Sequence, residues 1–163
     1  MITIKDLLNT IPQTGKLEWI GLRTERRGPV TSVKSVEAIS GKGLKGDRKV
    51  LGTTADSNRQ VTLIQAEHLA VIASFMQTEK IEPELLRRNL LVSGINLLAL
   101  KNKKFYVGEV LFEGTGECHP CSRMEETLGA GGYNSVRGHG GITAKVLTDG
   151  IIKISDIIKV YSQ

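Results

Sequence analysis

The chain has 163 residues, a length that suits one domain and allows a sizeable core to be buried. Hydrophobic residues make up 40% of the chain and charged residues 24%, which excludes a disordered or fibrous protein. The formal net charge of +5 suits an anionic partner, but aromatic residues reach only 4%, too few for the stacking platforms that bind single-stranded nucleic acid, so we expect no nucleic-acid partner.

Short runs of alternating apolar and polar residues predict strands in the first half of the chain. These strands cover residues 16–23, 33–39 and 60–65. The loop 40–48 holds three glycines together with Lys42, Lys45 and Arg48, so it can adopt positive φ angles and display cations. Helical segments are predicted over residues 66–76 and 83–88.

The second half of the chain predicts more short strands with one helix between them. The strands cover residues 90–92, 142–147, 151–154 and 157–161, and residues 105–113 form a strand pair or one bent strand with Gly108 at the turn. The helix is predicted over 122–128, because Ser122 and Glu125 have the spacing of a capping box, and a glycine-rich loop follows over 129–141. Residues 148–150 (TDG) separate two of the strands, and Asp-Gly is a hairpin signal, so we expect these two strands to pair.

Many short strands with few helices predict a mainly β fold of the α+β class, built as a barrel or a sandwich that hairpins close. No internal repeat, low-complexity tract or linker divides the sequence, so we expect a single domain over 1–163. Its first residues, about 1–15, are expected to form a loosely attached arm.

The sequence contains no signal for a membrane or for secretion. No stretch approaches the ~20 apolar residues of a membrane span, and residues 1–10 lack the basic-then-apolar pattern of a secretion signal. Two cysteines are too few for a dense disulfide framework. We therefore expect a cytoplasmic protein with no membrane partner.

Both cysteines lie in the segment 117–125, between a predicted strand and the helix predicted over 122–128. Cys121 immediately precedes Ser122, the expected N-cap, so the positive helix end and Arg123 would favour its thiolate. A thiolate is the form that attacks sulfur, carries a persulfide or binds a soft metal. Cys118 can equally be a small buried hydrophobe. A structural zinc site needs four ligands, which the three histidines could complete only at irregular spacing.

Two further regions offer contacts to an anion. The loop 129–141 lacks the G-K-[ST] ending of a P-loop, but its backbone amides with Arg137 and His139 suit a phosphate or the edge of a heterocycle; the alternative is a plain connection with glycines at its turns. Arg88 is the strongest of the remaining cations, because Asn89 and an apolar strand follow it and would draw it toward the core. The other candidates are Lys42, Lys45, Arg48 and Arg87.

Four blocks carry a resemblance to a known family. They are residues 46–48 (GDR), 60–67 (QVTLIQAE), 88–97 (RNLLVSGINL) and 118–125 (CHPCSRME). Together with the segment from Arg137 onward, they resemble the MOSC domain (molybdenum cofactor sulfurase C-terminal domain) over about 16–163. The resemblance implies a MOSC-type β-barrel, in agreement with the strand pattern. It also implies a role around the molybdenum cofactor, a phosphorylated pterin dithiolene.

The family's functional cysteine maps onto Cys121, and a catalytic activity is implied. Cys121 would be either a persulfide carrier in sulfur transfer or the metal ligand in a molybdenum-dependent reduction, and Cys118 a resolving partner or only a neighbour. The residues expected to bind the cofactor are Arg48, Arg88, Asn89, Ser122, Arg123, Arg137 and His139.

The length of the chain limits what the resemblance implies. Full-length sulfurases carry a pyridoxal-phosphate desulfurase domain for which this chain has no room, so we do not expect it to bind pyridoxal phosphate. A stand-alone module would receive sulfur or cofactor from a cysteine desulfurase or a molybdoenzyme. The alternative is a non-catalytic module whose basic, glycine-rich loops bind an anionic pterin, a small-molecule substrate or a protein partner.

Overall fold

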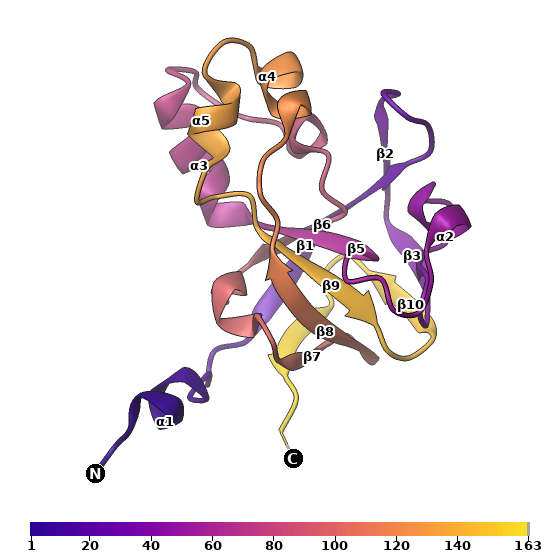
Figure 1. Cartoon of the computed structure of the whole chain (residues 1–163), viewed down its shortest axis with the longest axis vertical. Helices are drawn as coiled ribbons and strands as arrows, with labels where there is room; N and C mark the ends of the chain where they lie inside the picture. The colour runs from indigo at the N-terminus through magenta and orange to yellow at the C-terminus, as the bar shows by residue number, and fades with distance from the viewer. Residues whose placement is uncertain (163) are drawn as a thin grey trace.

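A closed barrel of seven strands forms the centre of the computed structural model, which describes residues 1–162 (Figure 1). In order around the barrel, the strands are β11 (Ile157–Val160), β7 (Lys104–Val107), β8 (Val110–Glu117), β9 (Ile142–Val146), β5 (Val61–Gln65), β6 (Leu90–Ser93) and β1 (Gly15–Arg23). β1 closes the barrel by pairing with β11 at Gly15 and Lys16. β5 and β6 run parallel, and the other neighbours are antiparallel.

Two further pieces of sheet extend from the barrel. β2 (Val30–Val33) forms a hairpin with the second half of β1, and a separate three-stranded sheet contains β10, β3 and β4. These three strands are β10 (Gly150–Lys153), β3 (Ser35–Ile39) and β4 (Gly43–Leu44). The strand predicted over 33–39 is thus interrupted at Lys34, and its two parts belong to different sheets.

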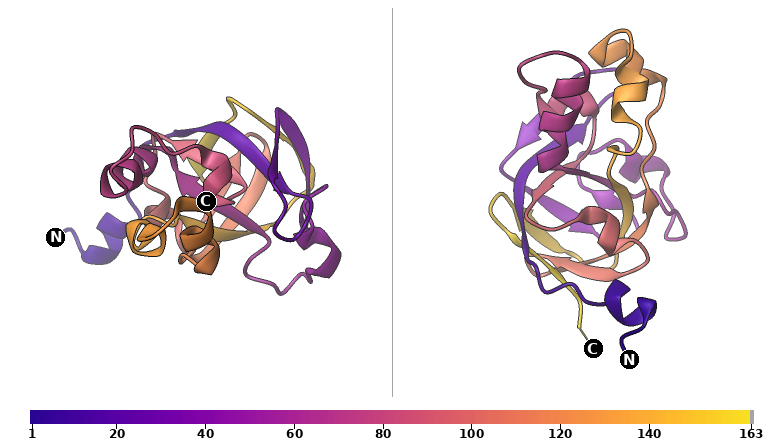
Figure 2. Two further views of the ribbon diagram at one scale, coloured as in Figure 1. Left: turned by 90° about the horizontal axis from the view of Figure 1, so that it is seen from above. Right: turned by 90° about the vertical axis from the view of Figure 1, so that its left-hand side faces the viewer.

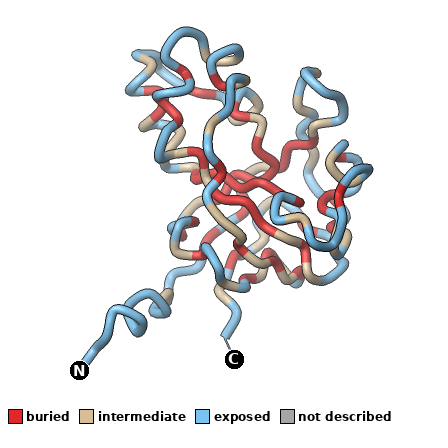
Figure 3. The backbone as a smooth tube through the Cα atoms, viewed as in Figure 1, coloured by how far each residue is buried: buried red, intermediate tan, exposed pale blue. Residues whose placement is uncertain are grey.

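Most of the helices gather at one end of the barrel, and both termini leave from the other end (Figures 1 and 2). The gathered helices are α3 (Ala66–Phe75), η1 (Pro83–Leu86), α4 (Ser122–Leu128) and α5 (Gly132–Val136). The remaining ones are α1 (Ile4–Leu8), α2 (Lys49–Gly52) and η2 (Leu97–Leu100). α1 projects away from the barrel, and residues 1–10 are all exposed (Figure 3). None of the helices in the described residues has the length and hydropathy of a membrane span.

Two apolar clusters stabilise this arrangement, and β5 and β6 contribute to both. Because side chains alternate along a strand, Leu63 and Leu90 point into the barrel interior, whereas Ile64 and Leu91 point toward the helices. The second cluster also contains Ile72, Ala73, Ile81, Leu86, Met124 and Val136. The helical end is therefore fixed to the barrel through strands that are buried on both faces.

The mainly β, α+β barrel expected from the sequence is confirmed. Two local predictions are wrong. Residues 129–141 are not a continuous loop, since they contain α5. The strands on either side of residues 148–150 do not form a hairpin, because β9 lies between β5 and β8 in the barrel whereas β10 pairs with β3.

Candidate functional site

The two cysteines lie where the chain leaves β8 for α4. The backbone N–H of Cys118 donates to the carbonyl of Gly141 at 2.8 Å and so continues the pairing of β8 with β9. A Cβ on Gly140 would lie 2.0 Å from the carbonyl oxygen of Cys118, so these two segments can approach only because residue 140 has no side chain. Cys118 is buried, with 2% of its surface exposed, whereas Cys121 is exposed.

Cys121 itself, rather than Ser122, is the N-cap of α4. Its backbone is extended (φ −128°, ψ 177°), its side chain makes no capping hydrogen bond, and its carbonyl accepts from the Met124 N–H at 2.9 Å. The predicted capping box is therefore wrong. The carboxylate of Glu125 instead accepts from the N–H groups of Tyr133 and Gly131, each at 2.9 Å, and these two bonds lower the pKa of Glu125. Cys121 thus presents a free thiol at the first turn of α4.

Arg88 holds the cysteine segment in place from inside the protein. Only 5% of the residue is exposed. Its Nε donates to the Gly140 carbonyl at 2.9 Å, and its Nη2 lies 3.3 Å from both the Cys118 and the His119 carbonyls. Its Nη1 donates to the Leu86 carbonyl at 3.1 Å. Burial lowers the pKa of Arg88 and the two cysteines raise it, which places a buried positive charge beside both sulfurs.

Several more guanidinium groups act on Arg87, the residue that precedes Arg88. Burial lowers the pKa of the half-buried Arg87, and Arg123, Arg23 and Arg48 lower it further, whereas Cys121 raises it. Arg87 therefore lies in the field of three other guanidinium groups and of this thiol. Its Nη1 also donates to the Gly28 carbonyl at 2.6 Å, which fixes the β1–β2 hairpin beside it. We call these residues, with Arg59 and Arg88, the arginine cluster: Arg23, Arg48, Arg59, Arg87, Arg88 and Arg123.

Arg59 extends the cluster toward the buried thiol. Its Nη2 lies 3.8 Å from the Sγ of Cys118. Burial lowers the pKa of Lys49, and Arg23, Arg59 and Arg48 lower it further, so the positive field continues over α2. A field of this kind favours an anion, and guanidinium groups suit phosphate oxygens in particular.

A buried polar node fixes the base of the cluster. Asp47 accepts from the N–H and the Nε of Arg23 at 3.0 and 3.3 Å and from the Nδ2 of Asn89 at 2.8 Å. Asn89, 1% exposed, also donates to the Gly21 carbonyl at 3.0 Å and accepts from the Thr62 N–H at 3.1 Å. Burial raises the pKa of Asp47, but Arg23 and these hydrogen bonds lower it on balance. Both ends of the Asn89 amide are thus used within the protein.

The structure brings some of the predicted residues together and separates others. Arg48, Arg88 and Arg123 belong to the arginine cluster with the two cysteines, and Ser122 is the first residue of α4. Arg123 also pairs with Glu126 one turn along that helix.

The two residues predicted on the glycine-rich segment lie differently. Arg137 is exposed, and its Nη1 lies 3.4 Å from the Oδ1 of Asn134. His139 packs on α3, with its Nδ1 at 3.4 Å from that of His68 and its ring centroid 5.8 Å from that of Phe75. Their roles as cofactor contacts remain predictions.

Sequence reasoning did not single out three members of the site. Arg23, Asp47 and Arg59 join it through contacts with residues that lie 24 to 66 positions away in the chain. Arg87 was only one of several candidate cations. The adjacency of Asp47 to Arg48 and of Arg87 to Arg88 is the local signal for two of these residues.

A metal bound here would need ligands from outside the chain. Among residues 1–162, no three His, Cys, Asp or Glu side chains come together as a possible metal site. Cys121 can therefore offer a metal one protein ligand, and the rest of the coordination would come with a cofactor.

The model of the MOSC domain family matches residues 46–159 of this chain. The YuaD protein from Bacillus subtilis has the same fold, with a TM-score of 0.76 and 21% identity over 94% of this chain and 100% of YuaD. YiiM from Geobacillus stearothermophilus gives a TM-score of 0.72 at 13% identity over 91% of this chain and 75% of YiiM. YiiM from Escherichia coli gives 0.68 at 15% identity over 91% and 70%. No curated protein matches the sequence significantly.

Proposed function

Because the chain belongs to the MOSC domain family, which is associated with the molybdenum cofactor, we propose that the arginine cluster binds this phosphorylated pterin and that Cys121 is the functional thiol beside it. One observation carries the proposal. An exposed thiol stands at the start of α4 within the electrostatic reach of Arg87 and Arg88. Positive charge of this kind favours an anionic ligand beside the thiol.

The residues present fit the cofactor's chemistry. Arg48, Arg87 and Arg123 would hold the phosphate, because guanidinium groups bind phosphate oxygens through paired, charge-assisted hydrogen bonds. Arg88 would contribute charge rather than direct contact, since its three nitrogens already bind backbone carbonyls. When bound, the molybdenum cofactor supplies a redox-active metal that accepts soft sulfur ligands.

In the first form of the proposal, Cys121 carries sulfur. Its thiolate attacks the outer sulfur of a persulfide on a donor such as a cysteine desulfurase. The new S–S bond forms on Cys121, the S–S bond of the donor breaks, and the donor cysteine leaves as a thiolate. Cys118, buried beside Arg59, would be the thiol that resolves this persulfide, or only a structural neighbour.

In the second form of the proposal, Cys121 is a molybdenum ligand in a reduction. The chain's own residues then bind and orient the cofactor, with Cys121 presented by the first turn of α4 and the phosphate held by the arginine cluster. A molybdoenzyme would be the partner that exchanges the cofactor in either form.

The alternative is a module that binds an anion without catalysis. It is favoured by the arginine cluster taken alone, which needs no thiol in order to hold a phosphate. The two functions differ in what they require of Cys121, so a single serine substitution separates them.

The decisive experiment combines two measurements on the full chain. The protein is produced with a cysteine desulfurase and cysteine, and intact mass spectrometry is used to detect an added sulfur atom. The protein is also incubated with the molybdenum cofactor, after which bound pterin is measured by fluorescence and molybdenum by elemental analysis. We expect wild type either to gain a sulfur atom that Cys121→Ser does not gain, or to retain more molybdenum than Cys121→Ser retains.

Controls distinguish the outcomes. Arg87→Ala should weaken pterin binding about tenfold, the loss of one charge-assisted contact. Lys159→Ala on β11 removes an exposed charge from another part of the barrel and should leave binding unchanged. Equal binding by the two variants would rule out the arginine cluster as the pterin site. Equal sulfur and equal molybdenum in wild type and Cys121→Ser would leave only the non-catalytic module.

A further inference from the structure

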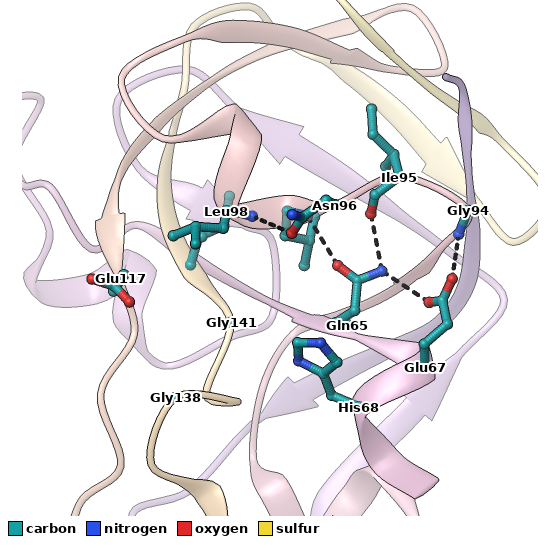
Figure 4. Close-up of a pocket in the computed structure, with 12 residues that line it drawn as sticks. Gln65, Glu67, His68, Gly94, Ile95, Asn96, Leu98, Glu117, Gly138 and Gly141 are labelled. Carbon is teal, nitrogen blue, oxygen red and sulfur yellow. Dashed lines mark hydrogen bonds between the residues drawn. The ribbon is translucent and has the colours of Figure 1, made fainter. Parts of the chain in front are cut away.

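A cavity of about 420 Å³ lies beside the cysteine segment, and Glu117, the last residue of β8, lines it (Figure 4). The next residue, Cys118, is not part of this lining, and its Sγ lies 3.8 Å from the Nη2 of Arg59. The volume lies within the range of small-molecule sites, about 300 to 1,000 Å³.

We propose that this cavity binds a small organic cation with an apolar body. The proposal rests on the charges and the shape of the cavity and does not depend on the function proposed for Cys121. Glu67 and Glu117 supply its carboxylates from opposite sides, and aliphatic side chains line it between them (Figure 4). The chain as a whole carries a net charge of +5, whereas these two carboxylates give the cavity negative charge.

Glu67 is the fixed carboxylate of the cavity. Its Oε1 accepts from the Nε2 of Gln65 at 2.8 Å, and its Oε2 accepts from the N–H of Gly94 at 2.9 Å. Burial raises the pKa of Glu67, but these hydrogen bonds lower it on balance, so the group is ionised at neutral pH. Each carboxylate oxygen can accept a further hydrogen bond, which leaves room for an N–H donor on a ligand.

Glu117 adds a second negative charge at the end of β8. Its nearest cation is Lys101, with 4.0 Å between Nζ and Oε2. Both side chains are more than 40% exposed, and exposed pairs of this kind contribute little free energy. A cationic ligand can therefore replace Lys101 at small cost.

His68 lines the cavity without adding positive charge. Burial lowers its pKa below 6.5, the neighbouring His139 lowers it further, and Glu67 opposes them. The imidazole is consequently neutral at pH 7. Its Nδ1 faces the Nδ1 of His139, so its Nε2 is the nitrogen that can meet a ligand.

The apolar part of the cavity is rigidly built. The amide of Gln65, a buried residue at the end of β5, donates to the Ile95 carbonyl at 2.9 Å and accepts from the Leu97 N–H at 2.9 Å. These bonds set the position of η2, whose exposed Leu98 lines the cavity, with Ile95, Leu97 and Ile142 of the barrel core behind it. A preformed apolar surface next to a fixed carboxylate suits a flat or compact hydrocarbon group that carries one cationic nitrogen.

The test compares three probes of nearly equal size on the full chain. Benzamidinium is cationic, benzamide is neutral and benzoate is anionic, and each is titrated against ¹⁵N-labelled protein by NMR. We expect benzamidinium to bind with a Kd near or below about 1 mM and to shift the amides of Gly94 and Leu98. Benzamide and benzoate should bind at least about tenfold more weakly, the effect of one charge-assisted hydrogen bond.

Substitutions locate the site. Glu67→Gln should weaken benzamidinium at least about tenfold. Glu109→Gln, an exposed residue at the β7–β8 turn, should have no effect. Because Glu67 also orders Gly94, a second variant, Leu98→Arg, places a competing cation on a residue that is 54% exposed and should also abolish binding without threatening the fold. Equal affinity for benzamidinium and benzamide, no binding of any probe, or full binding to Leu98→Arg would each overturn the proposal.

Discussion

Arg88 fixes the cysteine segment of the candidate site from inside the protein. Its guanidinium is buried, and each of its nitrogens binds a backbone carbonyl. A carboxylate is absent from its hydrogen-bond partners among the described residues, which is unusual for a buried cation. The positive charge of Arg88 can therefore act on a group that lies beside the cysteines.

Removing Arg88 should cost more stability than removing any exposed arginine. Arg88→Ala leaves the buried carbonyls of Gly140 and Cys118 without donors, so we expect the free energy of unfolding to fall by about 3 kcal/mol. Urea unfolding measures the change. Arg137→Ala is the matched control, because that residue is exposed, and its effect should stay within about 0.5 kcal/mol. Equal stability of the two variants would mean that Arg88 does not hold the two segments together.

Asp47 makes a pH-dependent contribution to stability. Its pKa in the folded state is lowered from 3.8, because the hydrogen bonds and Arg23 outweigh the effect of burial. A carboxyl whose folded pKa is depressed stabilises the protein above the unfolded pKa, and this stabilisation is lost as the pH falls through the folded value.

Asp47→Asn should therefore destabilise the protein at pH 7, and the difference from wild type should shrink as the pH falls below 3.8. Thermal unfolding of both proteins from pH 7 to pH 3 gives the measurement. Asp56→Asn, at an exposed turn, is the control variant. A difference that stays constant over this range would mean that the charge of Asp47 does not contribute.

At the scale of elements, the strands were predictable and their partners were not. Alternation and apolar runs predicted β1, β5, α3 and β11 within one or two residues. The same local patterns could not show that β9 enters the barrel while β10 pairs with β3. The Asp-Gly turn signal is present, but Asp149 accepts a hydrogen bond from the Ser40 N–H at 2.7 Å and so connects the turn to another hairpin.

The helix α5 was missed for a related reason. It has five residues and begins after a glycine with φ +88°, and the N–H groups of Gly131 and Tyr133 at its start donate to the carboxylate of Glu125. That carboxylate was assigned to a local capping box instead. In the candidate site, the proximity of Cys121 and Arg123 follows from their spacing in the sequence, whereas the contact of Arg59 with Cys118 joins residues 59 positions apart and has no local signal.

The contact between the two segments at the site depends on Gly140. The Cβ of an alanine there would lie 2.0 Å from the carbonyl oxygen of Cys118, so the backbone would have to move to relieve the clash. We expect Gly140→Ala to lower the free energy of unfolding by about 1–3 kcal/mol and to make Cys118 reactive toward a thiol reagent in the folded protein. Gly52→Ala is the matched control, since a Cβ at that position meets nothing within 4 Å. Unchanged burial of Cys118 in Gly140→Ala would contradict this account.

On the scale of the whole molecule, the two proposed sites meet at neighbouring residues of the chain. Cys118 contacts the arginine cluster through Arg59, whereas Glu117 lines the cavity together with Glu67. The two proposals therefore assign an anion and a cation to separate places within one small barrel.

The N-terminal arm is the part of the molecule that the barrel does not need. Residues 1–10 are exposed, whereas Ile11 packs against the barrel core. Deleting residues 2–10 should change the free energy of unfolding by less than about 0.5 kcal/mol, whereas Ile11→Ala should lower it by about 1–2 kcal/mol, because a partly buried side chain loses its contacts. Urea unfolding at two protein concentrations tests both changes. If the stability lost on deletion differs between the two protein concentrations, the exposed apolar residues of the arm contact a second chain.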